Sequence, residues 1–132
     1  QLQHHDKIKM ERLSIFKRYE DSLLELQNLG KITLVNKPKN QLGNGHLFYI
    51  LLTSKSERDK FIDHMKVNNI NCPFHYVPLH SSPAGFIYGK AFGEMNVTNC
   101  YSSRLVRLPL YYGLQEKMLN YVIKKVYEFF GV

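Results

Sequence analysis

Apolar residues recur at helical spacing near both ends of the chain. In residues 5–29 they are three and four positions apart, with charged residues between them, which predicts a long amphipathic helix that Gly30 would end. Its apolar face consists of Phe16, Tyr19, Leu23 and Leu26. Residues 114–130 repeat the pattern and predict a closing helix. Its stripe consists of Met118, Val122, Val126 and Phe129.

Continuous apolar runs predict the strands. The run "HLFYILLT" (46–53) is rich in aromatic and branched residues, as is typical of a buried strand. "INCPFHYV" (70–77) predicts a second strand, which Pro73 would place near a sheet edge or turn into a bulge. "VRLPL" (106–110) predicts a short strand broken by a proline, and "KITLV" (31–35) a short strand or extended segment.

A second helix and two loops are expected between these elements. Ser56 and Asp59 have the spacing of a capping pair, and the helix that they open is expected to end at residues 68–69. Residues 36–45 are rich in turn formers. Residues 78–97 contain five glycines or prolines and little periodicity, which predicts a long loop, a kind of segment that often carries function. A helical turn capped by Thr98 or Asn99 would follow.

This order of elements predicts one α+β domain. Three strands alternate with helices, and helices packed on one face of a three-stranded sheet would bury its apolar side. The length of 132 residues and the 44% hydrophobic content suit one globular domain. The start at a residue other than Met, without a clear helix cap, is expected of a chain cut from something longer.

Charge and cysteine content narrow the function classes. The formal net charge is +7, but Lys and Arg occur singly or in short pairs, so neither a polybasic block nor an RNA-binding motif is present. No nucleic-acid partner is therefore expected. No run approaches the roughly 20 apolar residues of a membrane span, and no signal peptide is visible, so no membrane partner is expected either. Cys72 and Cys100 predict ordinary buried or half-buried thiols of a reduced, cytoplasmic protein.

The segment "HYVPLHSSPAG" (75–85) carries the main candidate chemistry. His75 and His80 alone do not make a zinc site, which needs three or four ligands, and no other His or Cys lies at a recognised spacing. Nothing marks either cysteine as an activated nucleophile. Two interpretations stay open: the prolines shape a loop in which the histidines cap backbone groups, or His75, Tyr76 and His80 face a hydroxyl- or phosphate-bearing ligand.

Two other stretches carry weaker signals. His46 opens the first buried strand, where a surface or packing role is more typical than a ligand contact. "RLVRLPLYYGL" (104–114) has the pattern of core and turn, although Arg104 or Arg107 could face an anion.

Two motifs together resemble a known family. "FHYVPLHSSPAG" followed by "SSRLVRLPLYYGL" is similar to the C-terminal part of the DegT/DnrJ/EryC1/StrS sugar-nucleotide aminotransferases, with "GNGHLFYI" and "GKAFGE" as supporting pieces. The likeness spans nearly the whole chain and is weakest in residues 1–43. One departure is Ala91 with Phe92, near which relatives often have a histidine.

The resemblance implies that residues 1–132 are the small C-terminal domain of a fold-type-I pyridoxal-phosphate enzyme. Such enzymes move an amino group from L-glutamate to the 4-keto carbon of a 4-keto-6-deoxy sugar nucleotide, here dTDP-linked, in the biosynthesis of surface polysaccharides such as lipopolysaccharide and enterobacterial common antigen. The catalytic lysine and most cofactor contacts belong to a large N-terminal domain, so no catalytic residue is expected in this chain. Members of the family are homodimers.

Carried over by position, the resemblance implies a substrate-binding set with no metal ligand. It consists of His75 and Tyr76, then His80, and His46 as a weaker fourth. The alternative functions are a stand-alone basic α+β binding module and an interaction domain without a ligand. The length of the encoded gene product separates the enzyme from both alternatives.

Overall fold

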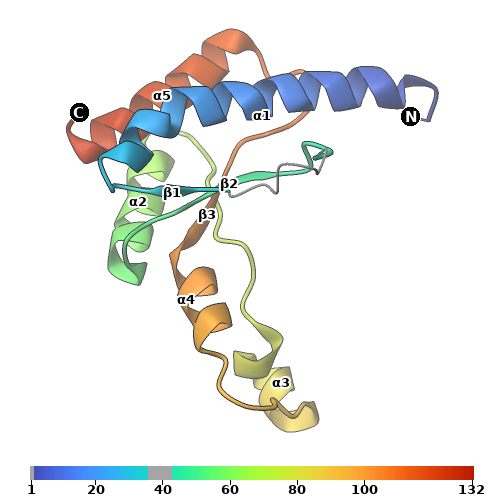
Figure 1. Ribbon diagram of the computed structural model, residues 1–132, viewed down its shortest axis with the longest axis vertical. Helices are drawn as coiled ribbons and strands as arrows, with labels where there is room; N and C mark the ends of the chain where they lie inside the picture. The colour runs from blue at the N-terminus through green and yellow to red at the C-terminus, as the bar shows by residue number, and fades with distance from the viewer. Residues whose placement is uncertain (1, 36–42) are drawn as a thin grey trace.

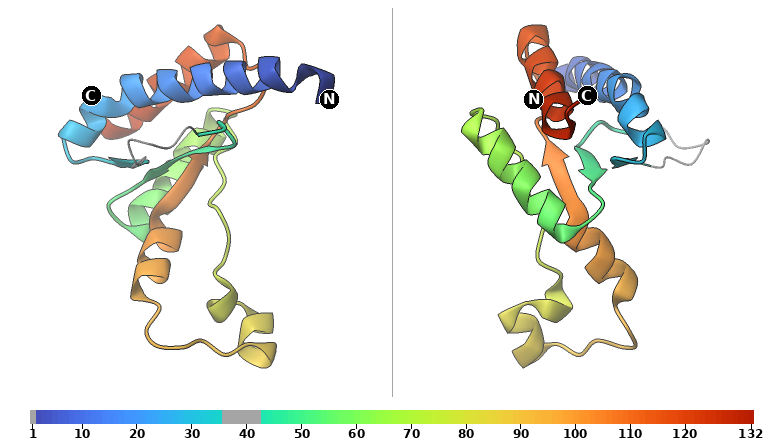
Figure 2. Two further views of the ribbon diagram at one scale, coloured as in Figure 1. Left: turned by 45° about the vertical axis from the view of Figure 1, so that its right-hand side comes forward. Right: turned by 90° about the vertical axis from the view of Figure 1, so that its left-hand side faces the viewer.

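The computed structural model describes residues 2–35 and 43–132 and has an antiparallel three-stranded sheet covered by helices (Figure 1). Strands β1 (Thr33–Leu34), β2 (Phe48–Leu51) and β3 (Leu105–Leu108) pair in that order. Helices α1 (His5–Asn28) and α5 (Glu116–Phe130) run side by side across the sheet, and an arm projects from the end of the sheet (Figures 1 and 2). The predicted α+β class and the three-stranded sheet are confirmed.

The sheet buries one face. Phe48 and Ile50 in β2 pair with Leu108 and Val106 in β3, and all four are at most 4% exposed. Tyr49 and Arg107 also pair across the two strands but are only partly buried. Since side chains alternate between the faces of a strand, the helices cover the first face, and Tyr49 and Arg107 lie on the other.

Helix α1 (His5–Asn28) follows the short 3-10 turn η1 (Leu2–His4) and supplies much of the core. The Phe48 ring lies 4.8 Å from Phe16 and 4.9 Å from Tyr19, centroid to centroid. The Tyr19 hydroxyl donates to the carbonyl of Pro109 over 2.9 Å. Gly30 ends the helix with a φ of +68°, as predicted from the sequence.

One edge of the sheet agrees with the prediction for residues 31–35, and the other differs from the prediction for residues 70–77. Thr33–Leu34 pairs with β2, whereas residues 70–77 make a single bridge, between Phe74 and Val106. The prediction of a strand over 70–77 was therefore wrong. Pro73 has no N–H for a ladder, and its carbonyl accepts one bond from Arg107 N at 2.9 Å. The Arg58 guanidinium of α2 lies 5.4 Å from the centre of the Phe74 ring, against this edge.

Helix α2 (Lys55–Val67) begins two residues earlier than its predicted cap would place it. The cap is Ser54, whose hydroxyl accepts from Glu57 N at 3.1 Å, rather than the predicted pair Ser56 and Asp59. The Glu57 carboxylate in turn accepts from Thr53 N at 2.8 Å, so the acid three residues after the cap identifies it. The predicted end is confirmed, with Asn69 at a φ of +58°.

Helix α5 (Glu116–Phe130) buries Leu119, Val122 and Val126. The predicted stripe was wrong at Met118, which is 47% exposed. Leu119 replaces it on the buried face, because positions 119, 122 and 126 keep spacings of three and four.

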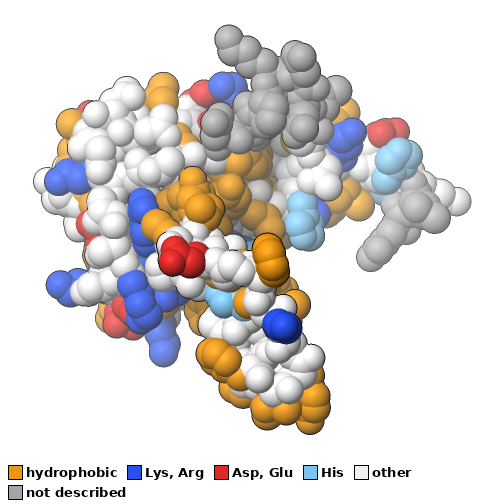
Figure 3. Space-filling model, turned by 60° about the horizontal axis from the view of Figure 1, so that its bottom comes forward, with side chains coloured by type: hydrophobic (Ala, Val, Ile, Leu, Met, Phe, Trp, Pro, Cys, Tyr) orange, Lys and Arg blue, Asp and Glu red, His pale blue; other side chains and the backbone are white. Residues whose placement is uncertain are grey.

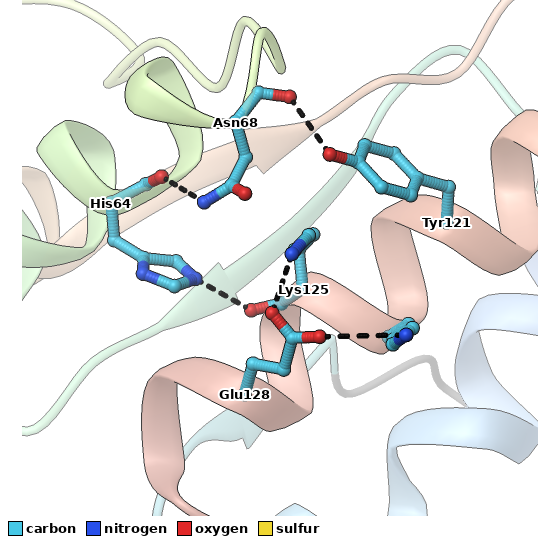
Figure 4. Close-up of polar contacts among 6 residues, drawn as sticks. His64, Asn68, Tyr121, Lys125 and Glu128 are labelled. Carbon is cyan, nitrogen blue, oxygen red and sulfur yellow. Dashed lines mark hydrogen bonds and ion pairs between the residues drawn. The ribbon is translucent and has the colours of Figure 1, made fainter.

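Polar contacts join α2 to α5 (Figure 4). The His64 ring Nε2 donates to the carbonyl of Lys125 over 2.9 Å, and the Tyr121 hydroxyl donates to the carbonyl of Asn68 over 3.4 Å. Lys125 also pairs with Glu128 at 2.6 Å and holds the pKa of that carboxyl below its usual value. His64 and Asn68 thereby dock the last turn of α2 on α5.

The arm comprises residues 78–104 and contains three helical segments, the first two where a loop was predicted and the third where a helical turn was predicted. They are the 3-10 turn η2 (Leu79–Ser81), α3 (Pro83–Tyr88) and α4 (Asn96–Arg104). The predicted cap of α4 at Thr98 or Asn99 was also wrong, because the helix begins at Asn96. Residues 36–42 of the predicted 36–45 loop lie outside the described residues.

We expect Leu23→Ala to lower the free energy of unfolding of this chain by about 2 to 5 kcal/mol, because it opens a cavity at a side chain that is 0% exposed. Leu24→Ala is the matched control. The Leu24 side chain is 48% exposed, so this substitution should lower the free energy of unfolding by less than about 0.5 kcal/mol. Urea unfolding followed by circular dichroism measures both. Equal losses would contradict this assignment of the buried face of α1.

Candidate functional site

The segment with the candidate histidines leaves the open edge of the sheet and enters the arm. Phe74 is bridged to Val106, and after Pro78 the chain forms η2. His75 and Tyr76 therefore lie at the junction of sheet and arm, whereas His80 lies within the arm (Figures 1 and 2).

The structure brings His75 and Tyr76 together. Their ring centroids are 4.6 Å apart, with the rings edge to face at 65°. Tyr76 is 69% exposed, whereas His75 is partly buried, and its Nδ1 is buried with no hydrogen-bond partner in the described structure. Burying a ring nitrogen without a hydrogen-bond partner costs free energy, and a ligand that bonds to this nitrogen would remove that cost.

Arg107 lies against the same tyrosine; the sequence had marked it only as a residue that could face an anion, outside the predicted substrate-binding set. Its guanidinium carbon is 5.8 Å from the centre of the Tyr76 ring, and its Nε is buried without a hydrogen-bond partner among the described residues. The signal in the sequence was a lone arginine between the buried positions Val106 and Leu108.

His80 connects the two sides of the arm. Its Nε2 lies 2.8 Å from Asn99 Oδ1 in α4, and since that oxygen can only accept, the histidine donates. Beside it is a cleft of about 400 Å³ that also contains Lys90, Met95 and Thr98. The cleft wall requires Gly85, because a Cβ there would lie 1.6 Å from the Leu79 carbonyl oxygen.

His46 lies at the opposite end of the sheet. It precedes Phe48, which pairs with Leu108, whereas the arm is attached at Leu105. His46 is exposed; its carbonyl accepts from Arg12 and its N–H donates to Asn44 Oδ1 at 2.9 Å. The structure therefore does not bring His46 together with His75, Tyr76 and His80.

The two cysteines differ in their surroundings. Burial raises the pKa of the Cys72 thiol to about 12, which makes it a poor nucleophile near neutral pH. Cys100 is exposed, so the prediction that both thiols are at least half-buried was wrong for Cys100. In the part of the chain that the structure describes, no group of three His, Cys, Asp or Glu side chains is arranged to hold a metal ion.

Apolar side chains cover the arm without being buried in it. Of residues 78–104, all of which are described, none is buried. Figure 3 shows hydrophobic side chains gathered over the projecting end. The most exposed are Leu79, Phe86, Tyr88 and Phe92, at 75 to 97%. None of the described helices is both long and apolar enough to cross a bilayer.

The profile of the DegT/DnrJ/EryC1/StrS aminotransferase family matches residues 1–127. The dTDP-3-amino-3,4,6-trideoxy-α-D-glucose transaminase of Micromonospora megalomicea subsp. nigra is 29% identical over 122 residues, which are 89% of this chain and 31% of that protein.

Solved structures share the fold. S. venezuelae DesV, in complex with a ketimine intermediate, has a TM-score of 0.85 and 25% identity, and the match covers 96% of this chain and 33% of DesV. Bacillus subtilis NtdA, with bound cofactor PMP, has a TM-score of 0.80 and 22% identity, over 95% of this chain and 29% of NtdA. The chain thus spans about a third of the length of these relatives.

We expect the 132-residue chain to self-associate through the arm, because water-exposed apolar side chains gain free energy when they are buried. Replacing Phe86 and Phe92 together by serine should weaken the association at least about tenfold. Met10→Ser, at a 71% exposed residue outside the arm, should leave it unchanged. Sedimentation equilibrium measures all three proteins, and a monomeric parent chain at high concentration would refute the expectation.

Proposed function

Since this chain belongs to the DegT/DnrJ/EryC1/StrS aminotransferase family, we propose that it forms the C-terminal small domain of a pyridoxal-phosphate-dependent sugar-nucleotide aminotransferase. One observation carries the proposal: the family profile matches residues 1–127, while the chain spans only about a third of each relative. A piece of this size with its own core suits one domain of a larger enzyme.

The proposed reaction moves the amino group of L-glutamate to the keto carbon of a 4-keto-6-deoxy sugar nucleotide. A dTDP-linked substrate is supported by the name of the Micromonospora relative, which is a dTDP-amino-sugar transaminase. That relative is named for an amino group at carbon 3, whereas the present proposal is carbon 4, so assays with 3-keto and 4-keto sugars would separate the two. Surface polysaccharide biosynthesis is the proposed context.

The cleft beside His80 does not by itself fit the cofactor. A site for pyridoxal phosphate needs a lysine for the covalent bond and a carboxylate for the pyridine nitrogen, and the cofactor then supplies the electron sink of amino transfer. The cleft beside His80 is lined by Lys90 but by no carboxylate. We therefore assign most cofactor contacts to a large domain outside this chain; bound PMP in NtdA supports the choice of cofactor.

The part assigned to this chain is to bind and orient the sugar. His75 offers a ring nitrogen without a partner, and Tyr76 an exposed hydroxyl beside it. His80 holds the arm in place through Asn99 while its other ring nitrogen remains for a ligand. His46, at the other end of the sheet, is assigned only a weaker, separate contact.

Two further features belong to the proposal. The exposed apolar arm suits an enzyme that buries it against its large domain or a second subunit, as in a homodimer. The free thiols of Cys72 and Cys100 suit a reducing compartment, and hence the cytoplasm.

We expect the 132-residue chain to be inactive, whereas the protein encoded by the complete reading frame transfers the amino group of L-glutamate to a dTDP-4-keto-6-deoxy sugar. Both should be mixed with pyridoxal phosphate, reduced with borohydride and mapped by mass spectrometry. One specific lysine should be labelled in the full protein and none preferentially in the chain. A single labelled lysine among residues 1–132 would refute the domain assignment, and a reading frame that starts near Gln1 would refute the proposed enzyme.

We expect His75→Ala in the full-length protein to impair the half-reaction with the sugar and to spare the half-reaction with glutamate. Losing one hydrogen bond to a buried partner should cost about 1 to 3 kcal/mol, or roughly 5- to 150-fold in kcat/KM for the keto sugar. His75→Asn keeps a donor and an acceptor and should lose less.

Stopped-flow measurement of both half-reactions tests this prediction. Equal losses in the two half-reactions, or loss of cofactor, would mean that His75 serves the fold or the cofactor instead of the sugar.

A further inference from the structure

The uncovered face of the sheet presents a cation without a counter-ion. Arg107 in β3 pairs with Tyr49 in β2, on the face opposite the core. Its Nε is buried and donates to no atom of the described residues, and no ion pair with a described carboxylate involves it. A buried Nε without an acceptor loses hydration without gaining a bond in exchange, which costs free energy.

A neighbouring arginine differs from Arg107 in having partners for its side chain. Arg104, three residues earlier, donates from Nε to the carbonyl of Leu52 at 2.6 Å and from Nη1 to Cys100 Sγ at 3.4 Å. Arg104 therefore ties the base of the arm to the end of β2. The side chain of Arg107 donates no comparable bond to a described residue.

Tyr76, beside Arg107, and His75, which contacts Tyr76, would complete a binding site. The Tyr76 ring lies 5.8 Å from the guanidinium carbon and contacts the ring of His75, whose Nδ1 is buried and also lacks a partner. Two buried nitrogens without partners therefore belong to residues that contact the same tyrosine. The planar guanidinium can donate two parallel bonds to one oxyanion, and a ring nitrogen that carries its proton can donate a third.

We propose that Arg107, with Tyr76 against its guanidinium and His75 beside it, binds one oxyanionic group of a substrate, a carboxylate or a phosphate. This assignment rests on the proposed function, which supplies both chemistries: carboxylates in L-glutamate and phosphates in the sugar nucleotide. It gives Arg107 a positioning role for the substrate and makes His75 a shared contact between the anionic group and the sugar.

The first test is steady-state kinetics of the full-length protein. In Arg107→Gln, KM should rise roughly 10- to 100-fold for whichever substrate supplies the anion and stay within about 2-fold for the other. Arg107→Lys keeps the charge but cannot donate two parallel hydrogen bonds, so its KM should lie between the KM of wild type and that of Arg107→Gln. Arg18→Gln is the matched control, because Arg18 is exposed, lies outside the candidate site and donates a hydrogen bond to Asn120 Oδ1.

The second test is calorimetric binding, which needs no activity. Glutarate probes the carboxylate source and dTDP the phosphate source, and Arg107→Gln should weaken one of them roughly 10- to 100-fold. If the full-length protein binds a probe through Arg107 but transfers no amino group, the anion site stands and the proposed function fails.

Unchanged KM values for both substrates in Arg107→Gln would overturn the site. So would a lowered melting temperature with unchanged KM values, because Arg107 would then pair with a carboxylate of the protein itself. If the full-length protein transfers no amino group, the binding data decide. The proposed site would then be overturned if wild type and Arg107→Gln bound glutarate with the same affinity and also bound dTDP with the same affinity.

Discussion

The small sheet has helices for only one of its two faces, and this constraint governs the rest of the structure. Val106 and Leu108 point into the core with Phe48 and Ile50, because α1, α2 and α5 cover that side. Strand alternation then forces Arg107 onto the other side. A residue that would be costly in the core is thereby kept on the face that the helices do not cover.

The arm follows from the same constraint. Residues 70–77 lie along the free edge of β3, but Pro73 limits the pairing, so the chain leaves the sheet and returns through α4. The return is fixed at its base, where Leu52 N donates to Arg104 O at 3.1 Å and the Arg104 side chain donates back to Leu52 O. Beyond that base the arm has local bonds, such as His80 with Asn99, and no apolar core.

Prediction from sequence succeeded where one face of an element is buried. Helix α1 and the strand around Ile50 were predicted because their apolar spacing reflects burial in this chain. Helix α3 was missed and α4 was predicted only as a helical turn with a later start, because neither helix buries a residue here and no periodicity marks them. The strand over 70–77 was predicted from apolar content. Ile70 and Cys72 do join the core, but Phe74, Tyr76 and Val77 are exposed. Apolar content alone therefore did not distinguish a paired strand from an extended segment at the sheet edge.

For a related reason, only part of the candidate site could be predicted from the sequence. His75 and Tyr76 stand next to each other in the sequence, and a bend at the sheet edge suffices to bring their rings together. Arg107 is about thirty residues away, and only the pairing of Pro73 with β3 brings it to the same tyrosine. The buried core closes without any residue of the arm, so the stability of this domain and the completion of its site depend on different contacts. Substitutions at Arg107 or His75 can therefore change binding while leaving the packing of α1, α5 and β2 intact.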